Sequence, residues 1–226
     1  MIETSVGRLI PFYEVTDGRK KNRPAVEYYN SGAVYSVYLQ NQTIIATPIG
    51  SIPAEFITFY ESGAVKRIFP LYGQISGYWT TQQEYELAEN VTFEVLGQEV
   101  TVKPLCIYFY ESGNIKSVTI WDKERLTFKT RYGEVTTDLG ISLYEDGRLQ
   151  SIEPVLGTEL YIPFVERIKL KSKIKSSGGK YNGIADVIYP FYAMAFRMHA
   201  DNCSLKFDEE GYIKSVRTVQ LYRNVS

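Results

Sequence analysis

The most concentrated charge in the sequence lies between Arg167 and Lys175. Lys169, Lys171, Lys173 and Lys175 alternate there with residues that are mostly apolar. Alternate side chains of a β-strand point to one face, so four ammonium groups would line up roughly 6 to 7 Å apart. Such a row predicts binding to an acidic partner, to a phosphate-bearing surface or to anionic lipid. The same pattern also fits a solvated edge strand, whose lysines prevent pairing with other chains.

Nucleophilic and metal-binding side chains are scarce, because the chain has 1 histidine and 2 cysteines. His199, Asp201 and Cys203 alternate, so a strand would place them on one face as a metal site or a Cys–His pair. Alternate residues of a strand lie about 7 Å apart, which is too far for a direct hydrogen bond. We interpret the segment as a turn followed by a small buried thiol, and we expect no metal and no cofactor. The glycine-rich segment 176–183 lacks the spacing of a phosphate loop and is interpreted as a flexible hairpin loop.

Carboxylates recur at one kind of position. Glu61, Glu111, Glu145 and Glu209 each stand two residues before a glycine, where Asn30 stands in the first instance. Turn chemistry explains acidic residues at such positions. A glycosidase needs two carboxyl groups that face each other across about 5 to 9.5 Å. We therefore expect no enzyme, and keep a carboxylate-dependent hydrolase as an alternative.

Aromatic side chains recur in register with these acids. Tyr29, Tyr60, Tyr110 and Tyr144 each stand three residues before the same glycines, where Asp208 stands in the last instance. They are out of phase with the apolar positions around them, so they should point to the opposite face of a sheet. The row predicts a recognition surface for a protein or a glycan. It also fits cross-strand pairing, or a face that the insertions cover.

These residues belong to an internal repeat. Five segments share apolar or aromatic residues six and four positions before a glycine, and two and five positions after it. The residues two apart lie on one strand face, and the acidic or amide residue before the glycine suits a type I turn with a G1 bulge. The residues three apart on the return strand require one break of parity, which predicts a bulge or a strand end near Lys66 and Arg67 and at the equivalent places. The repeat predicts hairpins near 26–37, 57–68, 107–118, 141–152 and 205–216.

Two insertions interrupt the repeat, at 80–104 and 158–203. The first contains a predicted short helix near 81–89, which Thr81 and Glu84 would begin as a capping box. A hairpin with its turn at Leu96 and Gly97 follows. We interpret the second insertion as having strands of its own.

Composition and length limit the alternatives. The chain has 226 residues, with 25 basic and 26 acidic side chains, and this balance argues against nucleic-acid binding. No run of apolar residues reaches the roughly 20 needed for a membrane helix, and no secretory leader is recognisable, so we expect a cytoplasmic protein. The predicted fold is all-β: one domain over 1–226, built as an elongated, twisted, mostly antiparallel sheet of hairpins. Two lobes divided near residue 158 are the alternative.

The segment from Phe59 to Trp79 resembles the MORN-repeat variant of bacterial proteins of the YwqK-like antitoxin type. Gly63, Val65-Lys66, Gly73, Gly77 and Trp79 fit that repeat, and the other four units keep only its hairpin half. The resemblance implies a β-sheet binding protein, with an antitoxin- or immunity-type role among its expected functions, and MORN repeats are also linked to phospholipid surfaces. We therefore predict a non-catalytic protein-interaction module whose partner is another protein. Peripheral binding to anionic lipid through Lys169–Lys175 is the alternative, and the sequence does not indicate an oligomeric state.

Overall fold

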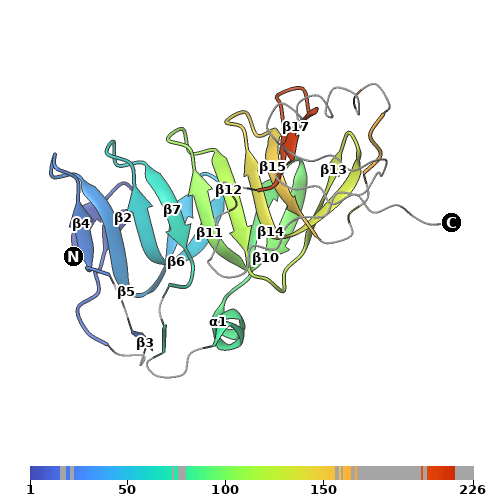
Figure 1. The fold of residues 1–226 in the computed structure, drawn as a ribbon. Coiled ribbons are helices and arrows are strands. Elements are labelled where there is room, and N and C mark those ends of the chain that lie inside the picture. Colours follow the sequence, from blue (N-terminus) through green and yellow to red (C-terminus); the bar gives the residue numbers. More distant parts are fainter. Residues whose placement is uncertain are drawn as a thin grey trace. The chain divides into compact units, whose positions relative to one another are not determined.

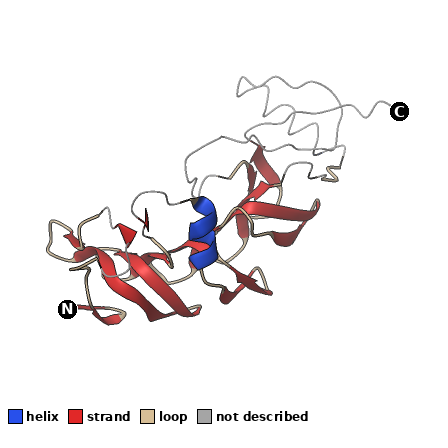
Figure 2. Cartoon of the chain, turned by 90° about the horizontal axis from the view of Figure 1, so that it is seen from below, coloured by secondary structure: helices blue, strands red, loops and turns tan. Residues whose placement is uncertain are grey.

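The fold is described from a computed structural model, which covers residues 1–15, 19–20, 23–72, 74–75, 80–155, 158, 160–163, 166, 200 and 203–216. It is an all-β fold of antiparallel strands with one short helix among the described residues, as the sequence predicts (Figures 1 and 2). The chain forms two compact units, unit 1 over residues 1–121 and unit 2 over residues 122–226. The boundary falls between the third and fourth hairpins. That the chain acts as one domain stays a prediction.

Unit 1 holds the first three hairpins of the repeat. Six of its strands pair in the order β4-β5-β6-β7-β11-β12, and all of these pairings are antiparallel. Smaller two-stranded pairs are β1 with β2, β3 with β8 and β9 with β10. The bounds are β1 Ile2–Thr4, β2 Gly7–Leu9, β3 Arg19–Lys20, β4 Val26–Tyr28, β5 Val34–Thr47, β6 Gly50–Phe59, β7 Val65–Phe69, β8 Gln74–Ile75, α1 Thr81–Leu87, β9 Val91–Val95, β10 Gln98–Val102, β11 Pro104–Phe109 and β12 Ile115–Ile120.

Unit 2 holds the last two hairpins. Its strands pair in the order β14-β15-β16-β17, and β13 pairs with β14. The bounds are β13 Leu126–Thr130, β14 Gly133–Leu143, β15 Leu149–Pro154, β16 Leu205–Phe207 and β17 Ile213–Val216. Most of the predicted insertion 158–203 lies outside the described residues.

The five repeat turns have the geometry that the sequence predicts. In each, the glycine amide donates to the carbonyl three residues before it, and that residue's amide donates at 2.8 Å to the carbonyl after the glycine. The five glycines have φ between 81° and 91°, a left-handed conformation that a side chain would strain. These are type I turns with a G1 bulge. Every hairpin is therefore closed in the same way.

The predicted break of parity is confirmed as a β-bulge three residues after each glycine. In the second hairpin, Thr58 pairs with Arg67 and Phe59 with Val65, so that Lys66 is left out of the register. The bulge returns the next apolar residue to the inner face, where Ile57 opposes Ile68. These inner pairs form the core, and the members with 0% exposure are Val37, Ile57, Ile68, Ile107, Val118, Ile141, Ile152 and Leu205.

The predicted helix is confirmed as α1 from Thr81, but its N-cap lies one residue earlier than expected. Thr80 is the N-cap, and its side chain accepts from the amide of Gln83, whose side chain in turn accepts from the Thr80 amide. The predicted capping box of Thr81 and Glu84 is therefore wrong. Both spacings fit the motif, but the Glu84 side chain is 2% exposed and packs inward instead of capping. The hairpin predicted at Leu96 and Gly97 is confirmed as β9–β10.

A second kind of turn, which the sequence analysis missed, has the pattern Thr-x-x-Gly. At Thr4–Gly7, Thr47–Gly50 and Thr130–Gly133, the threonine hydroxyl donates to the glycine carbonyl at 2.7 to 2.8 Å. Two of these turns contact repeat turns of unit 1. The Ser5 hydroxyl donates to the Gly63 carbonyl at 2.6 Å. A methyl group added at Gly113 would lie 2.9 Å from Pro48 Cγ.

Candidate functional site

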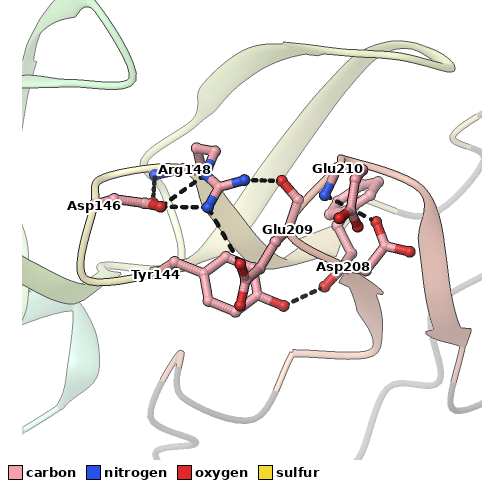
Figure 3. A network of polar contacts seen from close by, with 7 residues as sticks. Tyr144, Asp146, Arg148, Asp208, Glu209 and Glu210 are labelled. Carbon is pink, nitrogen blue, oxygen red and sulfur yellow. Dashed lines mark hydrogen bonds and ion pairs between the residues drawn. The ribbon is translucent and has the colours of Figure 1, made fainter.

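The four tyrosines of the predicted row occupy the first position of their turns and are half-buried. Three of the hydroxyls donate to the main chain of the next hairpin. Tyr29 donates to the Phe59 carbonyl, Tyr60 to the Phe109 carbonyl and Tyr144 to the Phe207 carbonyl, each at 2.8 Å (Figure 3 shows Tyr144). Every acceptor stands four residues before its own turn glycine. These three tyrosines therefore join the first hairpin to the second, the second to the third and the fourth to the fifth.

The protonation of these phenols fits that role. Burial is the main cause that raises the pKa of Tyr29, Tyr60 and Tyr144 above the ordinary tyrosine value, and nearby carboxylates or phenols raise it further. A phenol held neutral remains a hydrogen-bond donor. The three side chains are thus fixed both in position and in protonation at neutral pH.

The opposite side of unit 1 from its apolar core carries tyrosines interleaved with cations. Arg67 of β7 and Tyr108 of β11 are register partners, and the Arg67 guanidinium carbon lies 4.2 Å from the Tyr108 ring centroid. Lys116, at the bulge of β12, places its Nζ 4.4 Å from the same centroid and donates to the Tyr108 hydroxyl at 3.3 Å. Tyr108 is therefore held between two cations.

The same arrangement extends to both neighbouring turns. Lys66 Nζ lies 5.2 Å from the Tyr60 ring centroid, and Lys116 Nζ lies 5.4 Å from that of Tyr110. In the first hairpin a tyrosine takes the place of lysine, and Tyr35 packs edge-on against Tyr29 at 5.1 Å. The tyrosine–cation face, as we call this surface, consists of Tyr29, Tyr35, Tyr60, Lys66, Arg67, Tyr108, Tyr110 and Lys116.

The electrostatics of the face centre on Tyr108. Burial favours its neutral form, but hydrogen bonds with Lys116 and Tyr60 and the nearby Arg67 charge outweigh burial and lower its pKa below the ordinary value. Lys66 and Lys116 have no carboxylate within ion-pair distance in the part of the chain that the structure describes. Both lysines thus carry a positive charge that no ion pair with a described residue neutralises.

Unit 2 has a different character at the same positions. Arg148 contacts the Asp146 carboxylate of its own turn and the Glu209 main-chain carbonyl of the next turn, while Asp208 accepts from the amides of Glu210 and Tyr212 (Figure 3). Arg148 and Asp208 are thus paired with groups of these two turns. The recurring acids Glu61, Glu111, Glu145 and Glu209 are exposed at the second position of their turns, which fits their interpretation as turn residues.

Unit 2 also contains a buried phenol at its Thr-x-x-Gly turn. The Tyr132 hydroxyl donates to the Glu166 carboxylate at 2.7 Å and accepts from the Ile213 amide at 3.1 Å. Burial, together with the hydrogen bond to Glu166, raises the pKa of Tyr132 to about 12. The ring stacks on Phe207 with centroids 6.4 Å apart. This phenol anchors the β13–β14 turn to the fifth hairpin.

Several predicted site residues lie outside the described residues. They are Lys169, Lys171, Lys173, Lys175, His199 and Asp201, together with Gly73, Gly77 and Trp79 of the repeat resemblance. Cys203 is described and is fully buried, with its Sγ 2.9 Å from the Ala200 carbonyl oxygen. No group of three or more His, Cys, Asp or Glu side chains able to hold a metal occurs among the residues whose structure is described.

Sequence reasoning found the tyrosine row but missed Arg67, Tyr108 and Lys116. The sequence did carry a signal for Arg67 and Lys116, because the break of parity predicted near Lys66 and Arg67, and at the equivalent place in the third hairpin, implies that side chains there point away from the apolar face. What the sequence could not supply is the order β7-β11-β12, which brings residues 67, 108 and 116 together across an insertion.

Comparison with known proteins gives no relative: no protein-family model, no curated protein and no solved structure matches the chain. The resemblance to the MORN-repeat variant therefore stays a prediction. In the described part of the chain, no helix combines the length and apolar character needed to span a bilayer.

Proposed function

We propose that this chain is a non-catalytic protein-interaction module of the MORN-repeat-variant kind, and that it binds its partner through the tyrosine–cation face of unit 1. The observation that supports this is the combination of aromatic rings with unbalanced ammonium groups at Lys66 and Lys116. Tyrosine and arginine are the residues that most often carry binding energy at protein interfaces. An antitoxin- or immunity-like role is the finer form of this proposal.

Rigidity makes the face suited to binding. Tyr29 and Tyr60 are held by hydrogen bonds to the neighbouring hairpin, and their turns repeat one backbone geometry. Side chains that are ordered before binding lose little conformational entropy when a partner arrives. A surface of this kind presents a fixed pattern of rings and charges.

The test is a tagged pull-down from a native lysate of the source cells, followed by mass spectrometry. We would compare the wild type with a Lys66→Gln/Lys116→Gln variant, and with the control Lys129→Gln/Lys214→Gln, which removes the same charge from exposed positions of unit 2. A discrete partner lost only in the first variant supports the proposal. Absence of any specific partner, or one retained equally by all three proteins, overturns it.

A further inference from the structure

The repeat places the two unbalanced lysines at a defined spacing. Lys66 and Lys116 both stand three residues after their turn glycines, at the bulges of β7 and β12. One strand, β11, lies between these two strands. Neighbouring strands are about 4.8 Å apart, so equivalent positions of these hairpins lie roughly 10 Å apart. The face therefore offers two ammonium groups at a separation set by the hydrogen-bonded sheet.

Besides the two lysines, the second and third hairpins carry three charged side chains, Arg67, Glu61 and Glu111. The Arg67 guanidinium adds a third positive charge beside Tyr108. Glu61 and Glu111, exposed at the turn tips, are the carboxylates of these two turns, and neither forms an ion pair with Lys66 or Lys116. Below the ammonium groups lie the rings of Tyr60, Tyr108 and Tyr110. The pair is thus positive above a floor of aromatic rings.

We infer that the tyrosine–cation face binds an extended acidic protein segment that crosses β7, β11 and β12, with carboxylates on Lys66 and Lys116. A chain extended as a polyproline II helix has three residues per turn and rises about 3.1 Å per residue, so acidic side chains three positions apart lie on one face at a spacing of about 9 Å, close to that of the lysines. The segment between them lies over Tyr108, which is 8% exposed and supports the Arg67 and Lys116 side chains from beneath. This inference rests on the proposed function and adds the chemistry of the partner.

The test uses a dye-labelled synthetic peptide, Glu-Thr-Thr-Glu-Thr-Thr-Glu, titrated with the whole protein and followed by fluorescence anisotropy. A surface ion pair contributes about 0.2 to 1 kcal/mol, so Lys66→Gln and Lys116→Gln should each weaken binding about 1.4- to 5-fold. The control Lys129→Gln should leave the affinity unchanged. Amide shifts in a nitrogen-15 spectrum should map to residues 66–67, 108 and 116, and circular dichroism melts establish that each variant is folded.

Four results would overturn the inference. They are equal binding of a Gln-for-Glu peptide, unchanged affinity in both lysine variants, shifts confined to other residues, and stronger lysine-dependent binding of inorganic phosphate or of phosphatidylglycerol vesicles than of the peptide. The last result would identify a phosphate-bearing ligand. If the pull-down yields a partner that depends on the lysines while the peptide fails, the proposed function stands and only the acidic segment is wrong. If both fail, the face itself is not a binding surface.

Discussion

Removing the Tyr60 hydroxyl tests whether the tyrosine row holds neighbouring hairpins together. Tyr60→Phe keeps the ring and its contact with Lys66, but it deletes the 2.8 Å hydrogen bond to the Phe109 carbonyl. A hydrogen bond of this kind contributes about 1 kcal/mol net, and we expect that loss in the free energy of unfolding. With an unfolding slope of about 2 kcal/mol per molar urea, the midpoint should fall by roughly 0.5 M.

The matched control is Tyr28→Phe, at a tyrosine that is 57% exposed. It removes the same atom from the first hairpin and should change stability by less than about 0.5 kcal/mol. Urea unfolding of both variants, followed by circular dichroism, gives the comparison. If Tyr60→Phe and Tyr28→Phe behave alike, the hydroxyls do not couple the hairpins. If Tyr60→Phe instead lowers partner binding at unchanged stability, the row serves recognition.

The remaining predictions concern the turns and the buried phenol of unit 2. Gly113→Ala should lower the free energy of unfolding more than Gly63→Ala. Both glycines have a positive φ, which costs about 1 kcal/mol or more with a side chain, but only the methyl group at residue 113 would also press against Pro48. Equal urea midpoints for the two variants would contradict this. Thr130→Val should cost about 1 kcal/mol by removing the hydroxyl that donates to Gly133, again measured by urea unfolding; a change within error would show that the turn does not need it. The folded-state pKa of about 12 for Tyr132 lies above the ordinary value of 10.0, so its contribution to stability is complete below pH 10 and is lost as the pH rises toward 12. Ultraviolet absorbance of tyrosinate should show an ionisation near pH 12 that is absent in Tyr132→Phe.

The hairpins were predictable because their signal is local. Five glycines fixed the turns, and the apolar spacing around them required a bulge on the return strand, which the pairings of Lys66 and its equivalents confirm. The helix was predicted at the right place, but its cap was misplaced because two overlapping threonine motifs compete for the same turn. The local pattern could not choose between them, since the choice depends on burial of Glu84.

The candidate site was predictable only in part. The position of the tyrosines relative to the glycines showed that they leave the apolar face, yet nothing in the sequence indicated that their hydroxyls reach the carbonyls of the following hairpin. Nor could it show that Tyr108 lies between Arg67 and Lys116, because that contact depends on which strands pair across the insertion at 80–104. The sequence alone therefore did not predict the contacts between segments that lie far apart along the chain.

The direction of the tyrosine hydrogen bonds has a consequence for how such a chain can evolve. The hydroxyls of Tyr29, Tyr60 and Tyr144 each donate to a main-chain carbonyl of the following hairpin, and the second hairpin provides both a donor, Tyr60, and an acceptor, the Phe59 carbonyl. Because the acceptor is backbone, the joint does not depend on the side chain it meets. A duplicated copy of such a hairpin would therefore carry both the hydroxyl donor and the carbonyl acceptor, and loss of one would leave a donor before the gap and an acceptor after it. The number of such hairpins can therefore change during evolution without a compensating mutation at the hydrogen bonds between them.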